Sequence, residues 1–296
     1  MDTIRFYNRY SQAVEEEPIY GERLLRWLYQ RPFGNFCERR FLSRKIFSSC
    51  IGWWMRRSWT RKYIDGFVEK YKINADIFEK KPSGYRSFDE FFSRRIKREF
   101  RPIAAKEDQL IFPCDGRHFV IESLQKIPYF FVKGQVFQLG SFLRDEALEK
   151  QFCDGSMLIS RLSPVDYHRF HFPCDALTET TYCIFGRYAS VNPIAIRDRI
   201  AVFWENKRMK TSLHHDLGDV LMIEIGATCI GSIEQTFHFN AKHLKGTEKG
   251  YFHFGGSTVV LLFEKGKIRF AQDLVKNSRA GMETYAFMGD EMATWA

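Results

Sequence analysis

Hydrophobic positions follow two different periods along this 296-residue chain, and the change lies near residue 110. In the stretch GERLLRWLYQRP, Leu24, Trp27 and Leu28 recur at helical spacing before Pro32 ends the pattern. The stretch SRKIFSSCIGWWMRRSWTRK has the same spacing over residues 46–54. We therefore expect the first hundred residues to be helical.

A further helix is expected in YRSFDEFFSRRIKREFRP. Ser87 and Glu90 have the spacing of a capping box at its start, and Pro102 is expected to end it. Its apolar face would comprise Phe88, Phe91, Phe92 and Ile96.

From residue 110 onward the apolar period becomes two, in short β-branched and aromatic runs separated by Gly, Asn or Asp. These runs are HFVIES, GQVFQL, DVLMIEIGATCIGSI and STVVLLFEKGKIRFA. The last one suggests a hairpin that turns at Lys265 and Gly266. Strands and helices do not alternate as a parallel sheet requires. The pattern predicts an α+β fold, with a helical N-terminal region (residues 1–100) and a mainly antiparallel β body (residues 101–296).

Charge changes the picture of the N-terminal region. The chain carries a formal charge of +9, and residues 1–70 hold fourteen Lys and Arg against eight Asp and Glu. Basic residues bracket the apolar stripe at 46–54, so this helix could lie in a lipid interface with Trp53 and Trp54 at headgroup depth, or pack on the protein's own core. An excess of positive charge favours an anionic partner, a nucleic acid or an acidic membrane. The sequence contains no recognisable nucleic-acid-binding module.

Neither a spanning segment nor a signal peptide is apparent in the sequence, and the seven cysteines show no C-x-x-C pair. We expect reduced thiols, a cytosolic compartment and peripheral attachment to the cytoplasmic face of the cell membrane.

Polar residues cluster at three places where a β body would favour apolar ones. FPCDGRH contains Asp115, RLSPVDYHRFHFP contains Asp166, His168 and His171, and Ser257 follows two glycines in GYFHFGGSTVVLLF. Each has a structural explanation, such as a turn or a bulge. The D-x-H-x-x-H spacing also suits a metal, although no further ligand lies near it in the sequence. An Asp, a His and a Ser from separate segments fit an activated hydroxyl.

Six blocks of the sequence resemble successive blocks of the phosphatidylserine decarboxylase proenzymes. They are FDEFFSRRIKREFRP, LSPVDYHRFHFP, VNPIAIRDR, WENKR, LMIEIGATCIGSI and KGTEKGYFHFGGSTVVLLFEKGKIRF. In that family a Gly-Ser bond cleaves itself, and the new N-terminal serine becomes a pyruvoyl group, a covalent cofactor. The resemblance implies cleavage between Gly256 and Ser257, giving a β chain (1–256) and an α chain (257–296) that remain associated.

The resemblance also implies residue roles. Asp115 would orient His171, and His171 would deprotonate Ser257 for attack on the Gly256 carbonyl; the ester would then eliminate, and the dehydroalanine left behind would hydrolyse to the pyruvoyl ketone. His168, with an ordinary pKa near 6.5, would protonate the substrate carbanion. The sequence departs from the family at FPCDG, where Ser-Pro-x-Asp-Gly is usual.

The implied reaction is the decarboxylation of phosphatidylserine to phosphatidylethanolamine through a Schiff base on the pyruvoyl group. It requires no metal and no pyridoxal phosphate, and the implied partner is the anionic membrane surface rather than nucleic acid; a homodimer is left open. The alternative is a serine hydrolase that uses Asp115, His171 and Ser257 on an external ester. That enzyme would remain a single chain.

Overall fold

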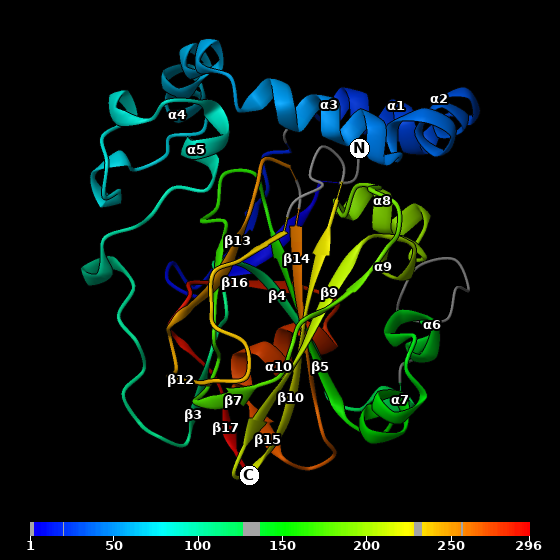
Figure 1. Cartoon of the computed structure of the whole chain (residues 1–296), viewed down its shortest axis with the longest axis vertical. Helices are drawn as coiled ribbons and strands as arrows, with labels where there is room; N and C mark the ends of the chain where they lie inside the picture. The colour runs from blue at the N-terminus through cyan, green and yellow to red at the C-terminus, as the bar shows by residue number, and fades with distance from the viewer. Residues whose placement is uncertain (1–2, 20, 127–136, 228–232, 256) are drawn as a thin grey trace.

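The computed structural model describes residues 3–19, 21–126, 137–227, 233–255 and 257–296 (Figure 1). Within them, eleven strands form one sheet in the order β12-β7-β9-β10-β14-β5-β4-β16-β1-β2, with β8 paired to β9. Two three-stranded sheets, β11-β13-β6 and β15-β17-β3, complete the β body. Every pair of named strands except β1 with β16 is antiparallel in this part of the chain, which confirms the expected α+β class and antiparallel body.

The strands are β1 (Arg5–Asn8), β2 (Ala13–Glu16), β3 (Gln109–Ile111), β4 (Gly116–Ile121), β5 (Ser156–Leu162), β6 (Arg169–His171), β7 (Ala176–Thr178), β8 (Tyr182–Ile184), β9 (Arg208–His215), β10 (Gly218–Gly226), β11 (Ile233–Gln235), β12 (Lys242–His243), β13 (Glu248–Phe252), β14 (Ser257–Phe263), β15 (Ile268–Phe270), β16 (Glu283–Ala286) and β17 (Glu291–Trp295). The helices are α1 (Glu22–Gln30), α2 (Pro32–Cys37), α3 (Lys45–Met55), α4 (Ile64–Lys70), α5 (Phe88–Phe92), α6 (Leu139–Leu143), α7 (Glu146–Phe152), α8 (Pro193–Asp198), α9 (Val202–Glu205) and α10 (Gln272–Arg279).

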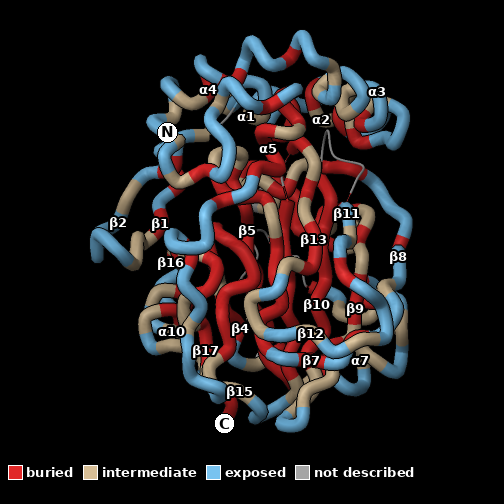
Figure 2. The backbone as a smooth tube through the Cα atoms, turned by 60° about the vertical axis from the view of Figure 1, so that its left-hand side comes forward, coloured by how far each residue is buried: buried red, intermediate tan, exposed pale blue. Residues whose placement is uncertain are grey.

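The centre of the large sheet is buried on both faces. Along β14, Val259 and Leu261 belong to one apolar cluster, whereas Val260 and Leu262 belong to another on the opposite face. Figure 2 shows β4, β5 and β10 of this sheet buried and the helices α3 and α7 largely exposed. A strand covered on both faces is apolar throughout, which explains why STVVLLF shows no polar alternation.

Helices α1, α2 and α3 lie across one end of the sheet, the end at which β14 begins (Figure 1). Their apolar side chains are only partly covered: Ile46 is 77% exposed and Trp53 is 54% exposed. The stripe at 46–54 therefore does not pack wholly on the protein's own core. No helix in the described ranges combines the length and the apolar character that crossing a bilayer requires.

Three sequence-based expectations are wrong in detail. The chain begins with a β-hairpin, β1–β2, rather than a helix, because β1 pairs in parallel with the distant strand β16. The capping contact from Ser87 to Glu90 is confirmed, but α5 ends at Phe92, because residues 95–97 form backbone bonds with 77–79 instead of continuing the helix.

The third concerns the expected hairpin at Lys265 and Gly266. The turn is present, with Gly266 at φ +72°, but the strands on either side join different sheets.

Of the run GQVFQL, only residues 137–139 are described, and α6 begins at Leu139. The six cysteines of the described residues are free thiols, and Cys229 lies outside this part of the chain.

Candidate active site

Ser257 opens the central strand β14, between β5 and β10. Its backbone is in register with Leu162 on one side and Gly226 on the other. Its side chain is fully buried, and its Oγ has no hydrogen-bond partner among the described residues. Gly255, two positions earlier, has φ +142°, a conformation that L side chains avoid. Gly256, the other residue of the expected cleavage site, lies outside the described residues.

His168 is buried, and only one of its two ring nitrogens has a hydrogen-bond partner among the described residues. Nδ1 lies 3.0 Å from the carbonyl oxygen of Asp166, which can only accept, so Nδ1 carries the proton. Nε2 therefore presents a lone pair, and no described residue bonds to it. The ring lies 3.8 Å from that of Phe92, measured between centroids. Burial, followed by the charge of Arg94, lowers the pKa of His168 to about 3, so the expectation of an ordinary pKa is wrong.

His171 ends strand β6 and is held through its backbone. Its N–H donates to the carbonyl of Pro113 at 2.7 Å, and its ring is stacked on that of Tyr167. Nδ1 is buried without a partner in the described part of the chain. Burial lowers the pKa of His171 to about 4, so the ring is neutral at pH 7.

Asp115 is bound to an arginine that the sequence analysis did not single out. The Arg101 guanidinium donates from Nε at 2.9 Å and from Nη2 at 2.5 Å, and the backbone N–H of Met288 donates at 2.9 Å. Both partners of this ion pair are buried. Within the described residues Asp115 and His171 share no hydrogen bond, nor do His171 and Ser257. In the sequence Arg101 is one of many basic residues, and no pattern distinguishes it.

The short helix α5 and Arg94, two residues after its end, connect the histidine segment with the glycine loop. Nη2 of Arg94 donates to the carbonyls of Val165 and Asp166, at 2.6 and 2.9 Å. Phe92 contacts both His168 and Phe254. The block FDEFFSRRIKREFRP thus supplies a wall of the site.

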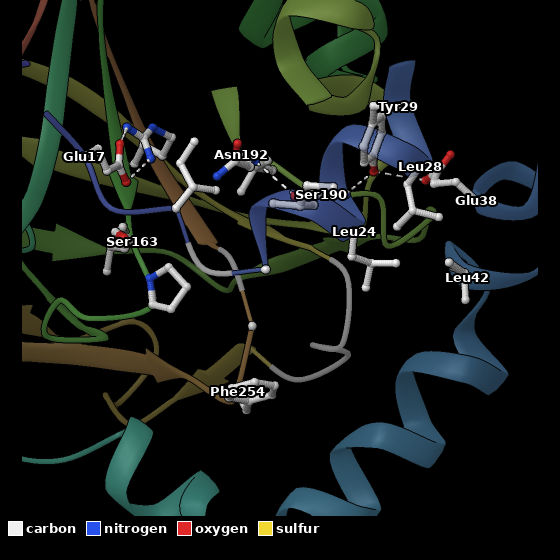
Figure 3. Close-up of a pocket in the computed structure, with 18 residues that line it drawn as sticks. Glu17, Leu24, Leu28, Tyr29, Glu38, Leu42, Ser163, Ser190, Asn192 and Phe254 are labelled. Carbon is white, nitrogen blue, oxygen red and sulfur yellow. Dashed lines mark hydrogen bonds and ion pairs between the residues drawn. The ribbon is translucent and has the colours of Figure 1, made fainter. Parts of the chain in front are cut away.

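A cavity of about 190 Å³ opens beside the glycine loop (Figure 3). Apolar side chains of α1 and its neighbours line one part of it, and Ser163, Phe254 and Gly255 line another. Glu17 also borders it, with its carboxylate bound to buried Arg161 at 2.5 Å. The cavity therefore links the partly exposed N-terminal helices with the segment that precedes Ser257.

The structure buries Ser257, His168 and His171, and no hydrogen bond within the described residues joins any two of these side chains. The site holds a serine without a hydrogen-bond partner and two neutral imidazoles, each with an unpartnered ring nitrogen among the described residues. Gly255, two residues before the serine, has a backbone conformation that other residues avoid. The same described residues contain no group of three His, Cys, Asp or Glu side chains arranged to hold a metal ion.

Known proteins were compared with the whole chain. Residues 88–293 match the family model described as phosphatidylserine decarboxylase. The chain is 42% identical to a phosphatidylserine decarboxylase proenzyme of Chlamydia pneumoniae over 293 residues, 99% of this chain and 97% of the relative. It is 39% identical to one of Clostridium botulinum (strain Hall) over 290 residues, 98% of each chain. Matches of this extent and identity establish that the chain belongs to the phosphatidylserine decarboxylase family.

Proposed function

We propose that the chain is a proenzyme that cleaves itself between Gly256 and Ser257, converts Ser257 to a pyruvoyl group and decarboxylates phosphatidylserine to phosphatidylethanolamine. The observation that carries the proposal is the buried Oγ of Ser257, which has no hydrogen-bond partner among the described residues and lies two residues after a glycine at φ +142°. Family membership favours this function over a serine hydrolase acting on an external ester.

His171 is proposed as the base for cleavage. Its neutral ring can accept the Ser257 proton at pH 7, because burial keeps the imidazole uncharged. The hydroxyl oxygen would then attack the carbonyl of residue 256, and elimination from the ester would release that residue's carboxylate. Asp115 would influence His171 through its charge from its position beside Arg101, or its side chain would rotate to form a hydrogen bond with His171 during cleavage.

His168 is proposed as the proton-transfer group for turnover. Its Nε2, to which no described residue bonds, can hold a proton and return it, while Nδ1 stays fixed on the Asp166 carbonyl. The pyruvoyl group derived from Ser257 would supply the electron sink for loss of carbon dioxide. Ser257 fits this role because it stands first in its strand and would become the N-terminus of the α chain.

The topology favours continued association of the two chains after cleavage. The α chain would contribute β14, which pairs with β10 and β5, and β16, which pairs with β4 and β1. Strand β17 pairs with β3 as well. These ladders join residues on opposite sides of the cleaved bond, so breaking one peptide leaves both chains within the same sheets.

The substrate is a lipid, and the N-terminal helices offer a surface for it. Exposed apolar side chains gather in this region together with basic residues, a combination that favours the anionic cytoplasmic leaflet. The large apolar residues that are more than half exposed there are Leu24, Phe33, Phe36, Phe41, Ile46, Trp53 and Trp59. We propose peripheral attachment at this surface, with the apolar part of the substrate entering the cavity.

Intact mass spectrometry tests the cleavage. Wild-type protein should give a fragment ending at residue 256 and a second fragment that begins with pyruvoyl, and Ser257→Ala should remain a whole, inactive chain. Thr258→Val is the matched control, because Thr258 is also buried and its hydroxyl has no hydrogen-bond partner in the part of the chain that is described. A whole wild-type chain with full decarboxylase activity would contradict the proposal.

Vesicle sedimentation tests the membrane surface. Trp53→Ser should weaken binding to phosphatidylserine vesicles, and salt should weaken it further, since charge attraction is screened over about 10 Å at 0.1 M. Phe185→Ser is the control, because Phe185 is 76% exposed outside the N-terminal helices. Equal binding by both variants and the wild type would refute this surface. Deleting residues 1–60 is less informative, since it would also remove β1 and β2 from the large sheet.

A further inference from the structure

The loop before Ser257 is tied to helix α5 by one carboxylate. Oδ1 of Asp89 accepts the backbone N–H of Phe254 at 2.9 Å, and Oδ2 accepts from Nδ1 of His253 at 2.7 Å. Asp89 is 5% exposed, and its two bonds go to consecutive residues. From this geometry we infer that Asp89 is a positioning residue for self-cleavage, an inference that rests on the proposed function.

Packing adds a third attachment at the same point. The ring of Phe254 contacts those of Phe88 and Phe92, with centroids 5.4 and 5.2 Å apart. Phe88, Phe92 and Phe254 belong to one buried cluster, so the start of the loop is held by α5 through both polar and apolar contacts.

The far end of the loop is held by the large sheet. Ser257 is in register with strands on both sides of β14, so its backbone position is fixed. Between the two anchors lie Gly255 and Gly256, and glycine has more conformational freedom to lose than any other residue. A reactive geometry requires the carbonyl carbon of residue 256 to stay close to Oγ. Asp89 fixes the residues on the N-terminal side of these two glycines and thereby restricts where the peptide before Ser257 can lie.

The two hydrogen bonds to Asp89, which we call the Asp89 clamp, have the chemistry needed to hold the loop in place. A carboxylate is only an acceptor, so Nδ1 of His253 must carry the proton in either charge state of the ring. Bonds from an amide and an imidazole to a charged, largely buried oxygen pair are stronger than neutral ones. The clamp therefore persists whether or not His253 is protonated.

Glu90, the next residue of α5, provides a matched comparison. Its carboxylate also accepts a backbone N–H, that of Arg86 at 2.7 Å, and a bond from Lys80 at 2.8 Å. Both partners precede α5, and neither belongs to the glycine loop. Loss of Glu90 should weaken the start of the helix, and loss of Asp89 should also release the loop.

The experiment follows cleavage of freshly translated, pulse-labelled full-length chain on denaturing gels. Asp89→Ala should lower the first-order cleavage rate constant at least tenfold, and Glu90→Ala should leave it within about twofold of the wild type. Asp89→Asn should recover most of the rate, because its amide oxygen can still accept the Phe254 N–H. Melting temperatures of Asp89→Ala and Glu90→Ala show whether a general loss of stability accounts for the effect.

Three results would overturn the inference: wild-type cleavage by Asp89→Ala, an equal loss in Glu90→Ala, or no recovery in Asp89→Asn. Slow cleavage in Asp89→Ala, with a melting temperature like that of Glu90→Ala and recovery by Asn, would support it. A wild-type chain that never cleaves would refute the proposed function, and this inference with it.

Discussion

The pH dependence of self-cleavage gives a direct measure of the environment of His171. Burial lowers the pKa of this imidazole to about 4, and as the proposed base it must be neutral to accept the Ser257 proton. With an ordinary pKa near 6.5, only about a tenth of the rings would be neutral at pH 5.5. With a pKa of about 4, nearly all of the rings are neutral at pH 5.5. The rate constant should therefore change by less than about twofold between pH 7.5 and 5.5.

The assay is intact mass spectrometry of pulse-labelled chain at several pH values, with tryptophan fluorescence to show that the chain stays folded. A tenfold fall in rate between pH 7.5 and 5.5, centred near pH 6.5, would refute the buried neutral base. A fall only below pH 5 would support it.

The same burial makes stability depend on pH with a definite sign. His118, His168 and His171 have pKa values lowered to about 3, 3 and 4, so below pH 6.5 the unfolded chain binds protons that the folded chain does not. Stability is therefore lost as pH falls through 6.5 toward these values. Each of the three rings lowers the free energy of unfolding by about 1.4 kcal/mol at pH 5.5 relative to pH 7.5, so the total loss is about 4 kcal/mol. Denaturant unfolding of the mature protein should show this loss, and a flat profile would contradict the burial.

Three further predictions concern single positions. His171→Ala should accumulate uncleaved chain, whereas His168→Ala should cleave but decarboxylate about 10²- to 10⁴-fold more slowly; equal loss of both activities in both variants would refute this division. Asp115→Ala should lower stability by about 3 to 5 kcal/mol in denaturant unfolding, because it leaves buried Arg101 unpaired; a loss below 1 kcal/mol would contradict the buried pair. Leu28→Trp should fill the cavity and raise KM for a short-chain phosphatidylserine while self-cleavage proceeds normally; an unchanged KM would place the substrate elsewhere.

Local pattern was sufficient for much of the β body. The strands β4, β10 and β14 lie where apolar runs predicted them, because β-branched and aromatic residues fit the buried, pleated surface of a sheet. The N-terminal hairpin was missed because β1 is stabilised by pairing with β16, more than 270 residues away. The early end of α5 has the same origin, a tertiary backbone pairing that overrides the helical period.

In the candidate site, too, the sequence predicted some features, whereas others depend on tertiary contacts. Ser257, His168 and His171 could be found from the family blocks, and the structure places all three in buried positions. Their protonation could not be predicted, because the lowered pKa values depend on burial by residues from other segments, such as Phe92 against His168. The partners Arg101 and Asp89 could not be predicted either, because each of them contacts a residue in another segment of the chain.

Burial connects the proposed cleavage with the fold around it. Excluding water lowers the pKa of His171, which keeps the base neutral, and it leaves the Ser257 hydroxyl without competing partners among the described residues. In the proposed function the ester must eliminate before water attacks it, and burial of the strand end restricts that attack. One water must still reach residue 257 after elimination, because hydrolysis of the dehydroalanine gives the ketone and ammonia. The substrate must nevertheless reach the same point after cleavage. The cavity that borders Gly255 and extends to α1 provides that approach from the N-terminal helices, where the exposed apolar side chains gather. Restricted access of water while the ester forms is thus compatible with a lipid substrate, provided that the substrate enters from the apolar side.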